Sequence, residues 1–219
     1  MKTDISIVKR ALLFQGMTEE EIVAMLNCLR ARSASYDKNS FIFRRGDSVS
    51  SIGLVTKGSI NIIEEDFWGN RSILSNVGPG NIFAESYACV QNKSLRVSVQ
   101  AAEPTSVLFL DIGKVVATCS SACEFHTRLV KNLLVVLAQK NLNVTEKLGH
   151  VTKRTTREKI MSYLSSESQK NNTMEFDIPF NRQEFADFLS VDRSALSKEL
   201  ARMSDEGVLE FKKNHFVLK

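Results

Sequence analysis

The feature that most constrains the fold is a series of short strand-like runs between residues 33 and 110. These runs are rich in β-branched and aromatic residues, and they read FIF, SIGLV, SINII, RSILSNV, LRVSVQA and SVLFLD. Glycine or polar turns separate them, at Gly46-Asp47, Lys57-Gly58, Gly69-Asn70 and Gly78-Pro79-Gly80. Strands this short and this regularly spaced are typical of an antiparallel barrel or sandwich.

The segments on either side of this region have helical patterns. Residues 18–31 open with Thr18 and acids in the first turn, then repeat apolar residues at helical spacing, which predicts a capped amphipathic helix. Residues 122–151 contain no proline and one late glycine, which favours a long helix. Residues 153–219 read as a helix, a polar loop, two short helices and two strand-like pieces. The predicted fold class is therefore α+β.

Heptad spacing along the long helix indicates a coiled-coil seam. Its members are Val130, Leu134, Leu137, Asn141, Val144 and Leu148. A single asparagine in such a seam fits a two-stranded pairing, because it can bond its symmetry mate and fix the register. The alternative is a helix packed on its own β domain through Leu129, Leu133 and Val136. Since the two sets occupy different stripes, both contacts can occur, and we expect a homodimer.

The segment around residues 181–203 has the pattern of a helix-turn-helix. Phe185, Ala186 and Leu189 form the apolar stripe of a first helix, and Ser190-Val191 forms the turn. We expect Asp192 to cap the second helix through its side chain. The inward residues of the second helix are Leu196, Leu200 and Met203. Its outward residues are Arg193, Ser194, Ser197 and Lys198, of which the arginine and the lysine can donate to guanine in the major groove.

A basic hairpin follows this motif. Lys212 and Lys213, with Asn214, bridge the two terminal strand-like pieces and predict a wing that contacts phosphates. The alternative is an ordinary two-helix hairpin with a solvated polar face. The hairpin beside the motif favours DNA binding.

Composition and charge limit the other classes of function that the chain could have. The net charge is +4 and no segment is a basic block, so nucleic-acid binding requires a local patch. No apolar run is long enough for a membrane span and the N-terminus does not resemble a signal peptide, so we expect a cytoplasmic protein with no membrane partner. No zinc site is expected, because the sequence contains no Cys-x2-Cys pair and we assign no ligand partner to the three histidines. Cys119 and Cys123, four residues apart, could form a redox pair, although two ordinary thiols are the favoured interpretation.

With these motifs, the chain resembles the Crp/Fnr family of transcription regulators over nearly its whole length. The resemblance rests on RRGD (44–47), TKGSI (56–60), GPGNIFAES (78–86), TEKLGHV (145–151) and RQEFADFLSVDRSALSKEL (182–200). It implies an N-terminal antiparallel β-barrel of jelly-roll type, a long dimerisation helix and a C-terminal winged helix-turn-helix. The implied domains are an effector domain at 1–121, the dimerisation helix at 122–152 and a DNA-binding domain at 153–219.

The resemblance also implies DNA-contacting residues. Arg193 matches the arginine that reads guanine, and Lys198 matches a basic residue that contacts bases or phosphates. Arg182 and Gln183 match positions that contact the DNA backbone. Ser194 stands where a glutamate is usual, so the familiar operator half-site is not expected. The implied partners are a palindromic double-stranded operator, a second copy of the chain and, if the protein activates, RNA polymerase.

The ligand cassette departs from the members that bind cyclic AMP. Those members have Gly-Glu at its start and Arg-Ser or Arg-Thr at its end, whereas this chain has Ala84-Glu85 and then Leu95 at the arginine position. Arg96 lies one residue further on, where strand alternation would turn it to the opposite face unless a bulge or loop absorbs the offset. We therefore expect weak or no cyclic AMP binding and an unidentified small effector. The candidate effector residues are Ala84, Glu85, Ser86, Arg96, Val97 and Thr145.

The sequence also bears on other effectors and on catalysis. The resemblance implies no iron–sulfur cluster, because only Cys28 lies near the N-terminus, and no haem, because residues 1–112 contain no histidine. The same lack of histidine disfavours a metal-dependent cupin-like enzyme, and no catalytic residues are assigned. A regulatory subunit that binds a nucleotide or metabolite and acts through a protein partner remains the main alternative.

Overall fold

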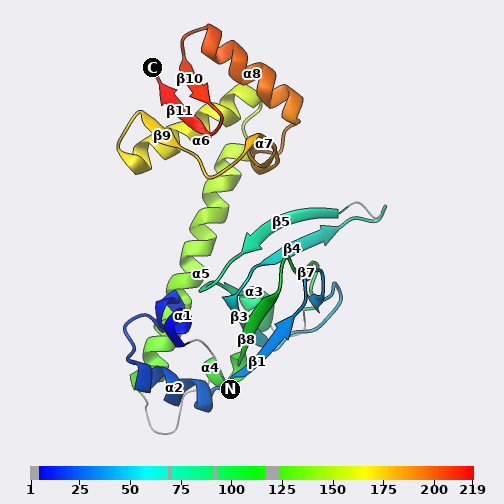
Figure 1. The fold of residues 1–219 in the computed structure, drawn as a ribbon, viewed down its shortest axis with the longest axis vertical. Helices are drawn as coiled ribbons and strands as arrows, with labels where there is room; N and C mark the ends of the chain where they lie inside the picture. The colour runs from blue at the N-terminus through cyan, green and yellow to red at the C-terminus, as the bar shows by residue number, and fades with distance from the viewer. Residues whose placement is uncertain (1–4, 69–70, 91–92, 117–123) are drawn as a thin grey trace. The chain divides into compact units, whose positions relative to one another are not determined.

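A computed structural model describes residues 5–68, 71–90, 93–116 and 124–219. The chain divides into two compact units, Met1–Ala138 and Gln139–Lys219 (Figure 1). Each unit has its own hydrophobic core. The α+β fold class is confirmed.

The first unit begins with three short helices, α1 (Ile5–Arg10), the 3-10 helix η1 (Leu12–Phe14) and α2 (Glu19–Cys28). Helix α2 has the predicted capping box. The Thr18 hydroxyl accepts from the amide of Glu21, and the Glu21 carboxylate accepts from the amide of Thr18. This exchange satisfies two amides that a helix start otherwise leaves without partners.

Eight antiparallel strands of the described residues form two four-stranded sheets (Figure 1). In the first sheet the order is β1 (Arg32–Tyr36), β8 (Thr105–Asp111), β3 (Ser51–Lys57) and β6 (Ile82–Phe83). In the second the order is β2 (Phe41–Phe43), β7 (Ser98–Ala101), β4 (Ile60–Glu65) and β5 (Arg71–Val77). The jelly-roll prediction is confirmed, although the described strands pair as two sheets and not as one closed ring.

A small apolar core joins the two sheets. Its buried members are Val55, Ile60, Phe83, Val99 and Val107. The ring of Phe83 lies over Gly53, where a Cβ atom would come within 2.2 Å of it. A side chain at that position would therefore displace Phe83, the residue directly before the cassette.

Three further helices complete this part of the chain: α3 (Glu85–Cys89), α4 (Ile112–Val116) and α5 (Glu124–Val151). Leu129, Leu133 and Val136 of α5 are buried in the core that also contains residues of α1, α2, β3 and β8. The amide group of Asn132 donates to the main-chain oxygens of Leu13 and Gln15, at 3.0 and 2.9 Å. Helix α5 is thus attached to the first unit through Leu129, Leu133 and Val136. This is the stripe that the sequence offered as the alternative to a coiled-coil seam.

The second unit contains the last part of α5 and a small α/β domain. Its elements are α6 (Thr156–Asn171), β9 (Glu175–Asp177), α7 (Arg182–Leu189), α8 (Arg193–Asp205), β10 (Leu209–Lys212) and β11 (His215–Leu218). The strands pair in the order β10-β11-β9. The sequence predicted a loop where β9 lies. This prediction was wrong because the three residues of β9 are held by pairing with β11, which is distant in the sequence.

Candidate nucleic-acid interface and ligand cassette

Local hydrogen bonds set the start of α7 and the turn that follows it. The side chain of Asn181 accepts from the amides of Gln183 and Glu184, and the Glu184 carboxylate accepts in return from the Asn181 amide. Ser190 then adopts the left-handed conformation with φ 52°, which disfavours residues with a Cβ. The turn closes through a bond from the Val191 amide to the Ala186 oxygen at 3.0 Å.

The prediction that the side chain of Asp192 caps α8 was wrong. Asp192 occupies the N-cap position of α8, but its side chain makes no capping hydrogen bond. Its main-chain oxygen accepts from the amide of Leu196 at 2.9 Å. The carboxylate is exposed to solvent, which solvates it without the cap.

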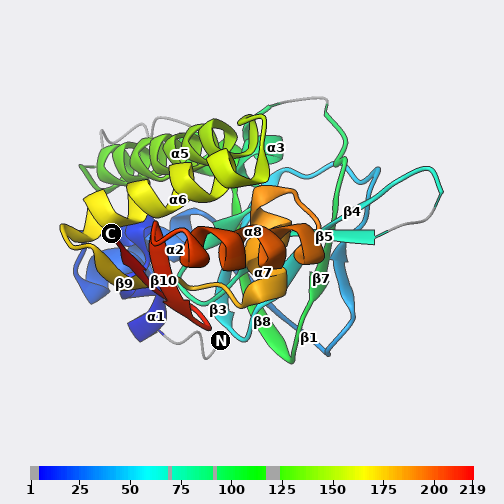
Figure 2. The same ribbon diagram turned by 90° about the horizontal axis from the view of Figure 1, so that it is seen from above.

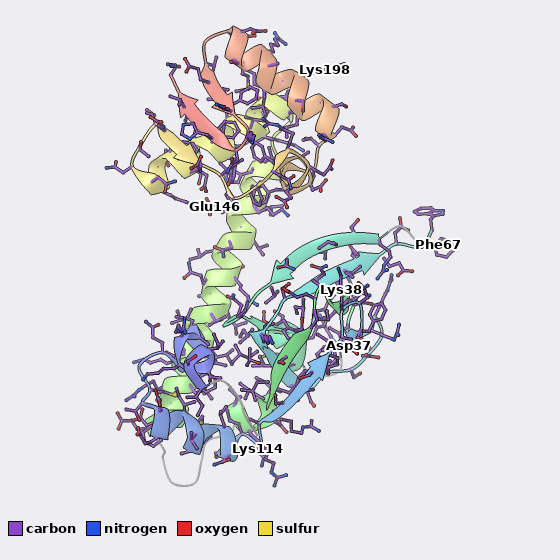
Figure 3. All side chains as sticks on the ribbon, in the orientation of Figure 1. Asp37, Lys38, Phe67, Lys114, Glu146 and Lys198 are labelled. Carbon is purple, nitrogen blue, oxygen red and sulfur yellow. The ribbon has the colours of Figure 1, made fainter. Side chains whose placement is uncertain are left out.

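Helix α8 has one buried face and one exposed face. Leu196, Leu200 and Met203 are fully buried in the second unit's core. The four predicted outward residues, Arg193, Ser194, Ser197 and Lys198, are all exposed. Figure 3 shows Lys198 on the outer side of α8. Helices α7 and α8 lie next to each other in both ribbon views (Figures 1 and 2).

The hairpin between β10 and β11 is positioned by Arg182, the first residue of α7. Its Nη2 donates to the main-chain oxygen of Lys213 at 3.2 Å, and its guanidinium lies 4.9 Å from the ring centroid of Phe211. Burial lowers the pKa of Arg182, and the positive charge of Arg193 lowers it further. The contacts of Arg182 with Lys213 and Phe211 hold the hairpin next to α7. Lys212, Lys213 and Gln183 are exposed.

Two cations on α6 hold the two ends of the α8 segment, and sequence analysis did not identify either. Lys159 Nζ donates to the oxygens of Leu189 and Ser190 at 3.1 and 3.3 Å, at the turn before α8. Arg157 pairs with Glu206, directly after α8, at 2.6 Å. In the sequence, Arg157 and Lys159 are simply two cations separated by one residue. That pattern does not reveal partners that lie 30 or more residues away.

The junction of α5 and α6 contains a buried histidine. His150 Nδ1 lies 2.8 Å from Ser162 Oγ, and its ring packs edge-on against Tyr163. Burial lowers the pKa of His150, and the nearby carboxylate of Glu146 opposes this effect. Glu146 is itself paired with Lys170 at 2.7 Å. The middle and the last turn of α6 are therefore fixed to the end of α5 by polar as well as aromatic contacts.

The backbone at the start of the cassette is strained, and the next residue, Glu85, is buried in the protein. Ala84 adopts the left-handed conformation with φ 63°, a conformation suited to glycine. Glu85 is buried, and Leu95 at the arginine position is also buried. Buried Leu95 offers no charge for a phosphate.

Arg96 lies on the exposed side of this segment. Together with Ser86, Tyr87, Val90, Lys93 and Ser94 it lines an open cleft of about 560 Å³. Arg96 and Val97 lie in a bend before β7 begins at Ser98, so strand alternation does not govern their direction. The main-chain amide of Arg96 donates to the Tyr87 hydroxyl at 3.4 Å. The structure thus brings Arg96 and Ser86 together, but neither Glu85 nor Leu95 lines this cleft.

The remaining predicted residues lie on α5. Leu134, Asn141, Val144, Thr145 and Leu148 are exposed, while Val130 is half-buried and Leu137 packs partly on the first core. Val135 and Leu142 are also exposed apolar residues, and the heptad assignment missed them. Thr145 donates to the main-chain oxygen of Asn141 at 2.9 Å and belongs to the second unit.

Cys119 and Cys123, for which the sequence favoured two ordinary thiols over a redox pair, lie outside the described residues. Within the part of the chain that the structure describes, no three His, Cys, Asp or Glu side chains are grouped to hold a metal ion. No helix among the same residues is long and apolar enough to cross a membrane.

Comparison with known proteins assigns a family domain to each unit. Residues 33–121 match the cyclic nucleotide-binding domain, and residues 146–219 match the Crp-like helix-turn-helix domain. The Cyclic AMP receptor protein of Thermus thermophilus is 28% identical over 103 residues, which are 47% of this chain and 46% of that protein. The alignment therefore spans about half the length of this curated relative.

Solved structures share the fold over most of the chain. The c-di-GMP responsive regulator CLP of Xanthomonas campestris superposes with a TM-score of 0.63 at 19% identity, covering 92% of this chain and 99% of that one. The Catabolite Activator Protein of Thermus thermophilus superposes with a TM-score of 0.51 at 20% identity, covering 95% and 94%. At these identities the similarity concerns the fold.

Lys159→Met tests the contact that holds the turn. We expect it to lower the stability of the second unit by about 1–2 kcal/mol, because two carbonyl oxygens lose a charged donor. Hydrogen exchange in peptides covering residues 182–205 should become faster, while peptides of the β-sheets keep their rates. Lys153→Met, which removes an exposed cation, is the control. Equal exchange in both variants would show that Lys159 does not hold the turn.

Proposed function

The chain belongs to the Crp/Fnr family of transcription regulators, and we propose that it acts as a homodimeric, sequence-specific DNA-binding regulator controlled by a small effector other than cyclic AMP. The observation that carries the proposal is α8, which keeps Arg193, Ser194, Ser197 and Lys198 exposed above a fully buried apolar face. A helix exposed in this way suits the major groove. The proposal takes residues 1–121, 122–152 and 153–219 as effector, dimerisation and DNA-binding segments and assigns no catalytic activity.

In this proposal the DNA contacts divide into two groups. Arg193 and Lys198 donate to base edges, with Ser194 and Ser197 beside them on the exposed face. Lys212, Lys213 and Gln183 contact phosphates, and Arg182 supports them by holding the hairpin through Lys213. Two heads in a symmetric dimer would read half-sites about 34 Å apart. RNA polymerase is the further partner if the protein activates transcription.

Arg193→Ala tests the assignment of the recognition helix. We expect affinity for an operator selected by the wild-type protein from random duplexes to fall by about 1–3 kcal/mol per half-site, because guanine loses a charged donor. Affinity for a scrambled duplex should fall much less. Arg202→Ala removes a cation that is paired with Glu206 and serves as the matched control on the same helix. The assignment fails if mobility-shift titrations show unchanged sequence preference for Arg193→Ala.

The dimer proposal rests on the exposed apolar side of α5. Leu134 is 61% exposed, Val144 65% and Leu148 56%, values that are high for large apolar side chains on one helix. A different stripe, formed by Leu129, Leu133 and Val136, is already buried in the first core. An exposed apolar seam with Asn141 within it fits pairing with the same helix of a second copy.

Leu134→Glu combined with Leu148→Glu tests this pairing. We expect the double variant to sediment as a folded monomer, because pairing would bury four uncompensated carboxylates, two from each copy. Val23→Glu places a charge on an exposed apolar position of α2 and should leave the dimer intact. A dimer that survives the double change in analytical ultracentrifugation would exclude α5 as the seam.

The effector proposal rests on the cassette. The family's cyclic AMP-binding members have an arginine where this chain buries Leu95, and Ala84 stands in the place of their glycine. Arg96 and Lys93 line the neighbouring cleft together with hydroxyl groups, which favours a small acidic effector. One relative is named for cyclic AMP and another is described as responsive to c-di-GMP, so membership of the family does not fix the ligand.

A thermal-shift titration tests the exclusion of cyclic AMP. We expect no rise in melting temperature at micromolar cyclic AMP, because a ligand stabilises only the state that binds it. Leu95→Arg restores the charge at the family position and provides the comparison. A clear rise in the wild-type protein at micromolar concentration would refute this part of the proposal and leave the DNA-binding part standing.

A further inference from the structure

A thiol and an imidazole meet where α2 ends and α5 begins. Sγ of Cys28, the last residue of α2, lies 3.7 Å from Nε2 of His126 in the first turn of α5. The two residues are 98 positions apart in the sequence. Cys28 is free and exposed to solvent, whereas His126 is only 7% exposed.

The buried imidazole has a polar atom that the surrounding fold does not satisfy. Among the described residues, Nδ1 of His126 has no hydrogen-bond partner, and the Cys28 thiol is the group facing Nε2. A buried polar group without a partner costs stability, and such groups often have a chemical role. An aliphatic side chain would fill the same space without that cost.

The orientation of the pair is fixed by the contacts around it. Arg128, two residues after His126, donates to the main-chain oxygen of Gly16 at 2.6 Å and pairs with Glu21 of α2 at 3.4 Å. Asn132 adds its two bonds to the segment before α2. The start of α5 is therefore anchored, and Nε2 is held toward the sulfur.

We propose that Cys28 is a reactive thiol activated by His126, and that small hydroperoxides are its substrates. The thiol proton passes to Nε2, and the sulfur forms a bond to one peroxide oxygen as the O–O bond breaks. The departing oxygen takes the proton from the imidazolium and leaves as water or an alcohol. Cys28 is oxidised by two electrons to a sulfenic acid, and the peroxide is reduced.

A hydroperoxide fits the shape of this site. Cys28 is exposed whereas His126 is buried, so a small reagent can approach the thiol from solvent without entering the core. His126, the base that takes the thiol proton, can return that proton to the departing oxygen. In a small peroxide this oxygen is bonded directly to the one that the sulfur attacks, so it stays close to the imidazole. The site thus requires no separate substrate pocket.

Cys89 provides an internal comparison within the same chain. It is also free and exposed, but burial raises the pKa of its thiol and the negative charge of Glu85 raises it further. The thiolate is the nucleophile, so Cys89 should react slowly at neutral pH.

The first test measures each cysteine of the full-length protein by peptide mass spectrometry at neutral pH. We expect iodoacetamide to alkylate Cys28 about tenfold faster than Cys89. After brief treatment with hydrogen peroxide, dimedone should label Cys28 and leave Cys89 unlabelled. Equal alkylation rates of the two cysteines, or no dimedone adduct on Cys28, would overturn the proposal.

The second test separates activation from a merely structural role. His126→Gln should slow alkylation of Cys28 about tenfold and leave the rate of Cys89 unchanged, because the proton acceptor is lost. Lys131→Ala removes an exposed cation of α5 and keeps the anchoring residues Arg128 and Asn132, so it should leave the Cys28 rate unchanged. An unaltered Cys28 rate in a folded His126→Gln variant, or an equal loss in Lys131→Ala, would show that His126 does not activate the thiol.

Discussion

Which side of α5 is buried decides much of what the rest of the chain can do. Leu129, Leu133 and Val136 enter the first core, and Asn132 satisfies two main-chain oxygens of the N-terminal segment. These contacts fix the rotation of the helix about its axis. Leu134, which lies outside this stripe, is then exposed, and His126 is held against Cys28 by the same rotation. A different rotation would change the exposure of Leu134 and separate the thiol from the imidazole.

Features that depend on neighbouring residues could be predicted from the sequence. The cap at Thr18 and the exposed face of α8 follow from side chains within one or two helical turns, and both are observed. Strand β9, the bonds of Lys159 and the Cys28–His126 pair depend on residues far away in the chain, so local patterns cannot reveal them. The direction of Arg96 could not be derived from strand alternation, because the residue precedes β7 and lies in a bend, the alternative that the sequence left open.

Three residues with a Cβ adopt left-handed backbone conformations at the two candidate sites, namely Ala84, Ser190 and Lys213. Ala84 begins the cassette and Ser190 forms the turn before α8, and each costs about 1–2 kcal/mol relative to glycine. Such strain persists only where surrounding contacts hold the conformation. At Ser190 the holding group is Lys159, whose ammonium meets two carbonyl oxygens. The free-energy cost of the Ser190 conformation is therefore offset by the bonds from Lys159 of α6. The start of α8 thus depends on the position of α6.

The charge balance places further limits on how the second unit could attract DNA. Cations and anions are nearly balanced over residues 153–219, so the unit has little net field to draw a duplex from a distance. Several anions of this unit are already paired with cations, as Glu206 is with Arg157 and Glu146 with Lys170. These pairs neutralise carboxylates that would otherwise repel phosphates. The proposed interface thus depends on the local cations of α8 and the hairpin, whose effect falls off within about 10 Å at moderate salt.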